Sequence, residues 1–298
     1  MTLRISTLLV ATALAASPAA AETVTNTELQ NLNGPTWSTT TDSTGTRTTS
    51  TGARISGSGL PAENWYQANV GGGGTVGITT DYARNGNGSA FFSTTSGSSK
   101  GDLQYNFAGL AELSTFSSLS YEFFRDASST TGDAFAPVFR LNMYKQTGST
   151  ISFAGSLVSE FLYQDQTNPP EGAWTTLSST QTDGIWWATS AALGPNFAAA
   201  NGGQKTLAEW IAGNAGSTLL VGGYNIGVGS GWNGTSSGAI DNIAITSARG
   251  VESFNFEVAG VPEPSTWALL ILGFGLTGAA LRRKVAVGVK SRSTLTFA

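Results

Sequence analysis

The sequence predicts an all-β exported domain, a jelly-roll-like antiparallel β-sandwich with one short helix. Apolar and polar residues alternate in short segments, most clearly in 119–123 and 135–144, as in strands with one buried face. Turn-forming residues separate these segments, and Asn85-Gly86-Asn87-Gly88 is the strongest such turn. The segments recur about every 10–15 residues, a spacing that favours two packed sheets.

The N-terminus has the features of a secretory signal peptide. Arg4 precedes an apolar segment over 8–16, and Ala19-Ala20-Ala21 supplies small residues for cleavage. We therefore expect residues 1–21 to be removed and the mature chain to begin near Glu22.

Residues 22–258 form the predicted sandwich domain. Its first part, 22–60, is rich in Ser, Thr and Gly, and we interpret it as an irregular edge of the sandwich. The one helix is expected over 205–212, where Thr206 and Glu209 have the spacing of a capping box. Strands are expected over 219–228 and 240–246, whereas 251–258 is either a closing strand or a stalk.

The C-terminal part combines a rigid joint, an apolar segment and a basic cluster. Pro262-Glu263-Pro264 precedes an uncharged segment over 265–281, which is just long enough to cross a bilayer as a helix. Arg282, Arg283 and Lys284 follow it directly, so the positive-inside rule places 285–298 in the cytoplasm as a tail and the sandwich outside.

This arrangement resembles the PEP-CTERM sorting signal of Gram-negative bacteria. The resemblance covers 259–284 and rests on Pro262-Glu263-Pro264, Trp267, Gly273-Phe274-Gly275-Leu276 and the basic cluster. It implies that an exosortase-type membrane transpeptidase cuts the precursor at the inner membrane. The domain would then pass to the cell surface or the extracellular matrix. A plain membrane anchor is the alternative, and the tail over 285–298 departs from the usual pattern.

Composition excludes several kinds of chemistry and partner. The sequence has no Cys and no His, which excludes Ser-His-Asp and Cys-His catalysis and the commonest zinc ligands. Between Glu22 and Glu263 there are 9 basic and 19 acidic residues, a net charge of 9 − 19 = −10. This balance argues against nucleic acid and anionic membrane surfaces as partners.

Two short motifs have modest specificity. Gly229-Ser230-Gly231-Trp232-Asn233-Gly234 matches the dinucleotide-binding pattern, but a strand rather than a helix is expected after it, so we interpret it as a turn. The segment 239–245 looks like the last strand of lectin-like jelly rolls. Alternation places its Asp241 on the side of Ile243 and Ile245, at the rim of the core. There it would bind backbone amides or, less favourably, Ca²⁺.

Tryptophans are the candidate ligand-binding residues, because an indole face can stack on a sugar ring. Most of them, including Trp174 and Trp210, lie in or beside predicted loops, and the four candidates are Trp65, Trp186, Trp187 and Trp232. Each has a core or sheet-edge role as its alternative. If Trp186 and Trp187 share a strand, only one of them faces inward, so the other is the better candidate.

No sequence spacing singles out a catalytic pair among the acids, which include Glu122, Asp126, Asp133, Glu160 and Asp165. We therefore predict no catalytic residues, no cofactor beyond a structural calcium ion, and a non-enzymatic, glycan-binding or matrix-associated sandwich that meets exopolysaccharide. A structural envelope protein without a discrete ligand and a polysaccharide hydrolase or lyase remain alternatives.

Overall fold

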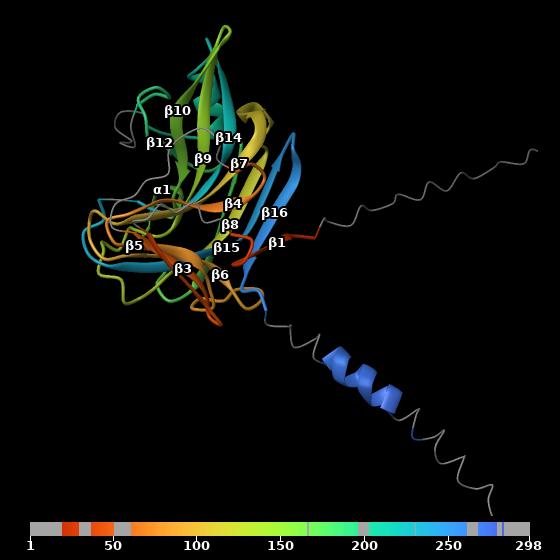
Figure 1. Cartoon of the computed structure of the whole chain (residues 1–298). Helices are drawn as coiled ribbons and strands as arrows, with labels where there is room; N and C mark the ends of the chain where they lie inside the picture. The colour runs from red at the N-terminus through yellow and green to blue at the C-terminus, as the bar shows by residue number, and fades with distance from the viewer. Residues whose placement is uncertain are drawn as a thin grey trace, which may run out of the picture.

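A computed structural model describes residues 20–29, 37–50, 61–165, 167–195, 203–229, 231–260, 268–278 and 282. Within these residues the chain is mostly β, and its strands form two sheets. Figure 1 shows the strands gathered in one body, with β9, β10 and β14 in one sheet and β15 and β16 in the other. The predicted all-β class is confirmed.

The seven-stranded sheet has a regular order, β13-β12-β10-β9-β14-β7-β4, and every described pairing in it is antiparallel. Its strands are β4 (Trp65–Gly71), β7 (Lys100–Glu112), β9 (Val138–Thr147), β10 (Thr150–Ser159), β12 (Trp186–Ala188), β13 (Gln204–Lys205) and β14 (Thr218–Val228).

The nine-stranded sheet forks at its longest strand, β15. One edge of β15 pairs with β8, while the other pairs first with β6 and then with β16. Its strands are β1 (Glu22–Thr25), β2 (Trp37–Asp42), β3 (Gly45–Ser50), β5 (Gly74–Thr79), β6 (Ser89–Thr94), β8 (Ser118–Arg125), β11 (Trp174–Thr180), β15 (Ser236–Ser247) and β16 (Gly250–Glu257). The segment 251–258 is thus a closing strand rather than a stalk, and β1 pairs with it in parallel.

Helices are few. The predicted capping box is present: Thr206 Oγ1 accepts from the Glu209 N–H at 3.2 Å and begins α2 (Leu207–Ala212). The chain also has α1 (Phe161–Asp165), the short 3-10 helix η1 (Leu113–Thr115) and a helix over 268–278. The helix over 268–278 falls within the predicted helical segment 265–281, whereas α1 and η1 were not predicted from the sequence.

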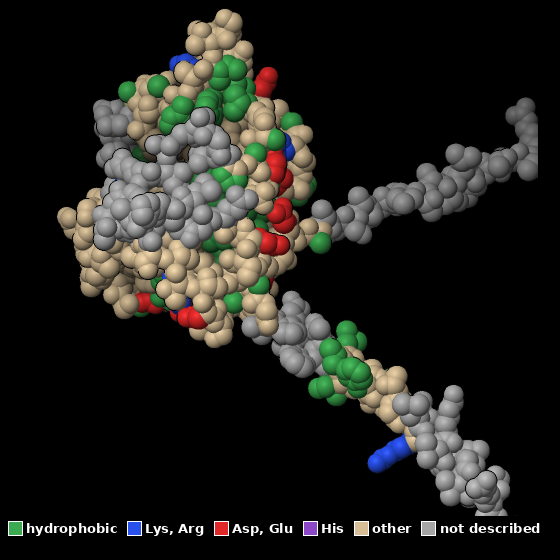
Figure 2. All heavy atoms as spheres, in the orientation of Figure 1, with side chains coloured by type: hydrophobic (Ala, Val, Ile, Leu, Met, Phe, Trp, Pro, Cys, Tyr) green, Lys and Arg blue, Asp and Glu red, His purple; other side chains and the backbone are tan. Residues whose placement is uncertain are grey.

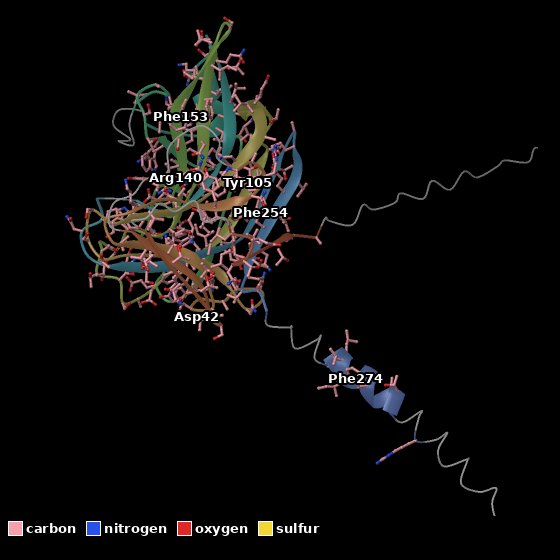
Figure 3. All side chains as sticks on the ribbon, viewed as in Figure 1. Asp42, Tyr105, Arg140, Phe153, Phe254 and Phe274 are labelled. Atoms are coloured by element: carbon pink, nitrogen blue, oxygen red, sulfur yellow. The ribbon has the colours of Figure 1, made fainter. Side chains whose placement is uncertain are left out.

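The core between the sheets is rich in aromatic rings. Trp65 lies edge-on to Phe254 and Phe256 with ring centroids 5.3 and 5.2 Å apart, and Tyr105 lies 5.2 Å from Phe254. Figure 3 shows Tyr105 and Phe254 in the interior of the domain. This packing replaces the disulfides that the sequence cannot form, since aromatic burial and ring contacts both stabilise the fold.

Candidate functional site

The neighbouring residues Trp186 and Trp187 lie on opposite faces of β12. Trp186 is fully buried, and its carbonyl accepts from the Trp210 Nε1–H at 3.0 Å. Trp187 is half-buried on the outer face, and its Nε1–H donates to Glu160 Oε2 at 3.1 Å. The alternation argument for this pair is confirmed, and Trp187 is the member on the outer face.

The other two predicted candidates, Trp65 and Trp232, pack against other aromatic rings. Trp65 is 2% exposed within the aromatic core, so neither it nor Trp186 can stack on a ligand in this structure. Trp232 is half-buried and stacks on Phe135 at 4.9 Å. The dinucleotide-like segment around Trp232 lies between β14 and β15, two strands, as the turn interpretation requires.

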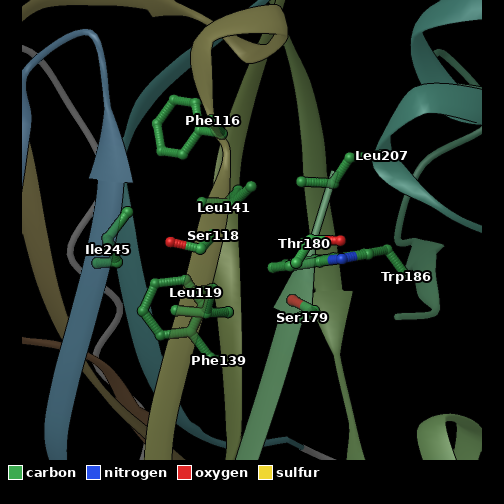
Figure 4. Close-up of a pocket in the computed structure, with 10 residues that line it drawn as sticks. All are labelled: Phe116, Ser118, Leu119, Phe139, Leu141, Ser179, Thr180, Trp186, Leu207 and Ile245. Carbon is green, nitrogen blue, oxygen red and sulfur yellow. The ribbon is translucent and has the colours of Figure 1, made fainter. Parts of the chain in front are cut away.

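A small cavity beside Trp186 is not a ligand site. Figure 4 shows it between the sheets, and its volume is about 10 Å³, near the minimum for one water molecule. Its lining is mainly apolar and includes Phe139, Leu141 and Leu207. A sugar ring is far larger than this space.

The outer face of the seven-stranded sheet carries a continuous row of side chains that we call the polar row. Strand register aligns its members across six strands, in the order Tyr66, Gln104, Asn225, Arg140, Val158 and Trp187. Adjacent strands lie about 4.8 Å apart, so the row spans roughly 19 Å from Gln104 to Trp187. Trp187, Arg140 and Gln104 are the half-buried members, whereas Asn225, Tyr66 and Val158 are buried.

Arg140 is the centre of the polar row and is held by two acceptors. Its Nη1 donates to Asp102 Oδ1 at 2.9 Å and to Asn225 Oδ1 at 2.5 Å. The other oxygen of Asp102 accepts from Asn69 Nδ2 at 3.0 Å. The guanidinium is therefore fixed in position, and Asp102 compensates its charge within the face.

Amide side chains continue the row toward β4. Gln104 Nε2 donates to Asn106 Oδ1 at 2.8 Å, and Asn106 Nδ2 donates to the Tyr66 hydroxyl at 2.8 Å. Burial raises the pKa of Tyr66 to about 12, and the hydrogen bond from Asn106 offsets part of this rise. The phenol thus stays neutral at physiological pH and serves as a fixed polar anchor.

Glu160 lies beside the row at the end of β10. Burial raises its pKa to about 7, while the Trp187 N–H and the Arg140 charge act in the opposite direction. Its carboxyl group orients the Trp187 indole through the hydrogen bond described above. In the sequence Glu160 was only one of several acids, and its spacing from them did not indicate its hydrogen bond with Trp187.

Aromatic rings also lie further along the same face. Tyr144 and Phe153 are opposite each other on β9 and β10, with ring centroids 5.4 Å apart and planes at 74°. Phe153 is 62% exposed. Between these rings and the polar row lie Asn142 and Ser156, which share a 3.3 Å hydrogen bond. The face thus has an aromatic group at each end of a polar stretch.

The outer face of the nine-stranded sheet is built differently. Its aromatic strip consists of Trp174, Phe124, Tyr82 and Phe91, whose rings pack on one another; Tyr82 stacks on Phe124 at 4.6 Å. Arg84 lies over Trp174 and binds Glu122 through two 2.9 Å hydrogen bonds. These contacts hold the pKa of Glu122 below its usual range, so Glu122 is an engaged ion-pair partner.

A shallow hollow of about 250 Å³ lies on the same outer face, between β8, β11 and β15. Small residues form its floor, among them Ser120, Ser178 and Ala244. No aromatic side chain lines it, so a sugar there would lack a stacking surface.

Asp241 lies where β15 forks. The β8 register shifts between Asp241 and Ala244, and Asn242 has φ 50°, so a bulge interrupts the alternation that would place Asp241 beside Ile243 and Ile245. Its Oδ1 accepts from the Phe256 N–H at 2.9 Å, as expected for a structural Asp. Burial raises its pKa to about 8. Among the described residues no three acids gather as a metal cluster, and calcium binding by Asp241 stays a prediction.

The sorting signal lies largely outside the described residues. Pro262, Glu263, Pro264, Trp267, Arg283 and Lys284 belong to that part, and Arg282 is described. In the helix over 268–278 the large apolar side chains are exposed, Phe274 by 71% and Leu270 by 47%. No helix within the described residues is long and apolar enough to span a membrane.

Comparison with known proteins identifies a sorting motif near the C-terminal end of the sequence. Residues 260–284 match the PEP-CTERM protein-sorting motif, and this stretch carries that motif. No curated protein matches the chain.

Several solved structures show a distant likeness. A family 11 carbohydrate-binding module of the cellulase Lic26A-Cel5E of Clostridium thermocellum has 12% identity and a TM-score of 0.34, with 64% of this chain and 91% of that chain covered. The family 11 module from Clostridium thermocellum in complex with a β-1,3-1,4-mixed-linked tetrasaccharide has 10% identity and a TM-score of 0.35, with 70% and 99% covered. A family 7 alginate lyase, A1-II′, has 9% identity and a TM-score of 0.27, with 57% and 81% covered. TM-scores this low do not establish a common fold.

Proposed function

We propose that the sandwich domain is a non-enzymatic glycan-binding module that acts at the cell surface or in the extracellular polymer matrix. The polar row supports this role, because it places the Trp187 indole on the same sheet face as fixed guanidinium and amide groups, within about 19 Å. Aromatic rings bind the apolar faces of sugars, and amide groups bind their hydroxyls.

Retention on the producer's own exopolysaccharide tests this binding face. Replacing Trp187 with Ala should weaken retention by about 1–3 kcal/mol, an amount typical of lost stacking on a ring. Trp174→Ala is the matched control, because Trp174 is also a half-buried tryptophan but belongs to the aromatic strip. Equal retention for wild type and Trp187→Ala, with the fold intact, would favour a structural matrix protein.

We also propose how the domain reaches its place. The signal peptide over 1–21 exports the chain, the segment over 265–281 holds the precursor in the inner membrane, and an exosortase-type transpeptidase cuts at Pro262-Glu263-Pro264. The cut breaks one peptide bond, leaves the new amine on the membrane fragment and passes the acyl group of the domain to water or another nucleophile. The match to the sorting motif over 260–284 supports this route.

Intact-mass measurement in a host with the processing enzyme tests the route. The surface form should lack everything after roughly Pro264, and replacing Pro262-Glu263-Pro264 with Ala-Ala-Ala should leave uncut precursor in the inner membrane. A surface form whose mass still includes 267–298 would show that the segment is only an anchor.

A further inference from the structure

The last residues of the sandwich are held by side chains from three other parts of the chain. The Phe256 N–H donates to Asp241 Oδ1 at 2.9 Å, the Val258 N–H to Asn87 Oδ1 at 3.0 Å, and the Ala259 N–H to Asn26 Oδ1 at 2.6 Å. We call Asn26, Asn87 and Asp241 the exit clamp. They hold the chain beyond Phe254, where the pairing of β16 with β15 ends while its pairing with β1 continues to Glu257.

Asn87 makes the most contacts in the exit clamp. Besides accepting from the Val258 N–H, its Nδ2 donates to the Val258 carbonyl at 3.0 Å, and its own N–H donates to Glu257 Oε2 at 2.6 Å. Both backbone groups of Val258 are therefore bonded to one side chain. Val258 itself is only 3% exposed.

The turn around Asn87 is shaped to the end of β16. A Cβ at Gly86 would lie 1.7 Å from the Glu257 carboxylate, and a Cβ at Gly88 would lie 2.8 Å from the Val258 nitrogen. The Glu257 side chain could move to admit a Cβ at Gly86, whereas at Gly88 the neighbouring atoms are backbone and glycine is required. The Asn85–Gly88 motif therefore does more than reverse the chain: it encloses the point where the chain leaves the sandwich.

The exit clamp lies very close to the sorting signal. Pro262 follows Ala259 by three residues, a reach of roughly 10 Å when fully extended. Proteases that bind an extended substrate segment pair with its backbone N–H and C=O groups. The Val258 and Ala259 groups that would serve this purpose are already bonded within the domain.

We propose that the exit clamp restrains the sorting cut. The processing protease can then bind the residues before Pro262 only when the end of β16 opens. This inference rests on the proposed cut at Pro262-Glu263-Pro264. The clamp joins the turn after β1, the loop before β6 and the fork of β15, so it closes only when all three have folded. The folded sandwich thereby slows its own cleavage from the membrane segment.

The test is the rate of precursor processing, measured by pulse-chase and intact mass on the full chain in a host with the exosortase-type enzyme. Asn87→Ala removes two side-chain hydrogen bonds and should speed the cut about tenfold, because easier opening raises the open fraction. Asn64→Ala is the matched control, since Asn64 is exposed and its side chain bonds only to the Ala62 carbonyl in the described structure.

The outcomes separate the two proposals. If wild type is cut and Asn87→Ala is cut at the same rate or more slowly, the exit clamp has no restraining role. If neither protein is cut, the sorting proposal fails and the clamp role fails with it. If only Asn87→Ala is cut, the restraint is stronger than expected and the inference stands.

A second variant and measurement guard against misfolding. Asn87→Asp keeps the acceptor for the Val258 N–H but replaces the donor to the Val258 carbonyl with an oxygen, so its processing rate should also rise. Amide hydrogen exchange on the full-length variants should show lost protection at Val258 and Ala259 and unchanged protection at Phe254. Unchanged exchange at Val258 and Ala259 in both variants would overturn the inference.

Discussion

The outer faces of the two sheets differ in the contacts that their aromatic and charged side chains make. On the nine-stranded sheet the rings of the aromatic strip pack on one another, and Arg84 and Arg47 each lie over a ring and pair with an acid. On the seven-stranded sheet Trp187 lies in the polar row and the Tyr144–Phe153 pair lies further along the strands, with Asn142 and Ser156 between the pair and the row.

This difference indicates a division of roles. A face whose rings cover one another gains stability and leaves little ring surface for a ligand. A face whose rings are separated by fixed polar groups offers both stacking surface and hydrogen-bonding groups.

Acidic side chains gather at one edge of the domain, over β16 and β1, as Figure 2 shows. Burial and the charges of Glu28, Glu252 and Glu63 raise the pKa of Glu22 there. That edge is unsuited to anionic ligands.

The largest expected effect separates the two faces of β12. Trp186→Ala should destabilise the protein by about 3–5 kcal/mol, because it leaves a large cavity in the core. Trp187→Ala should cost less than about 1.5 kcal/mol, since its half-buried ring leaves no closed cavity. Chemical denaturation of both full-length variants measures this. Equal losses would mean that the polar row is a structural part of the sheet rather than a binding face.

The next effect concerns pH and compares one buried acid from each sheet. Asp241 has its pKa raised to about 8, so the folded state keeps a proton that the unfolded state releases above about pH 4. The contribution of Asp241 to stability should therefore be fully present below pH 4 and fall by about 1.4 kcal/mol per pH unit as the pH rises to 8. Glu160, with a pKa of about 7, should act in the same direction over the narrower window from 4.5 to 7.

Isosteric variants assign these slopes. Asp241→Asn should flatten the pH dependence of the unfolding free energy between pH 4 and 8, and Glu160→Gln should flatten it only below pH 7. A slope that persists in the double variant would assign the effect to other groups.

Calcium is a further check at pH 8: if Asp241 binds the ion, adding calcium stabilises wild type and leaves the stability of Asp241→Asn unchanged.

Local signals in the sequence predicted much of the fold. The capping box at Thr206 and Glu209 and the alternation at Trp186-Trp187 each depend on residues close in sequence, and both are confirmed. Asp241 shows the limit: a single bulge at Asn242 shifts the register, and no local pattern indicated it.

The polar row could not be predicted from the sequence, because its six members come from six strands far apart in the chain. Alternation did place Arg140 and Asn142 on the face opposite Phe139 and Leu141. Which strand lies beside β9, and in which register, depends on tertiary packing. The exit clamp has the same origin, since Asn26, Asn87 and Asp241 meet only at the end of β16.

The smallest expected effect defines how far the binding face extends. Phe153 is 62% exposed and touches Tyr144 edge-on, so Phe153→Ala should change the unfolding free energy by less than about 0.5 kcal/mol. If a glycan runs from Trp187 past Asn142 and Ser156 to these rings, the same variant should weaken retention on exopolysaccharide by about 0.5–1 kcal/mol. Val251→Ala is the matched control, because Val251 is 61% exposed on β16 in the other sheet. Retention reduced by Trp187→Ala but not by Phe153→Ala would confine the ligand to the polar row, whereas equal losses for Phe153→Ala and Val251→Ala would indicate nonspecific apolar adsorption.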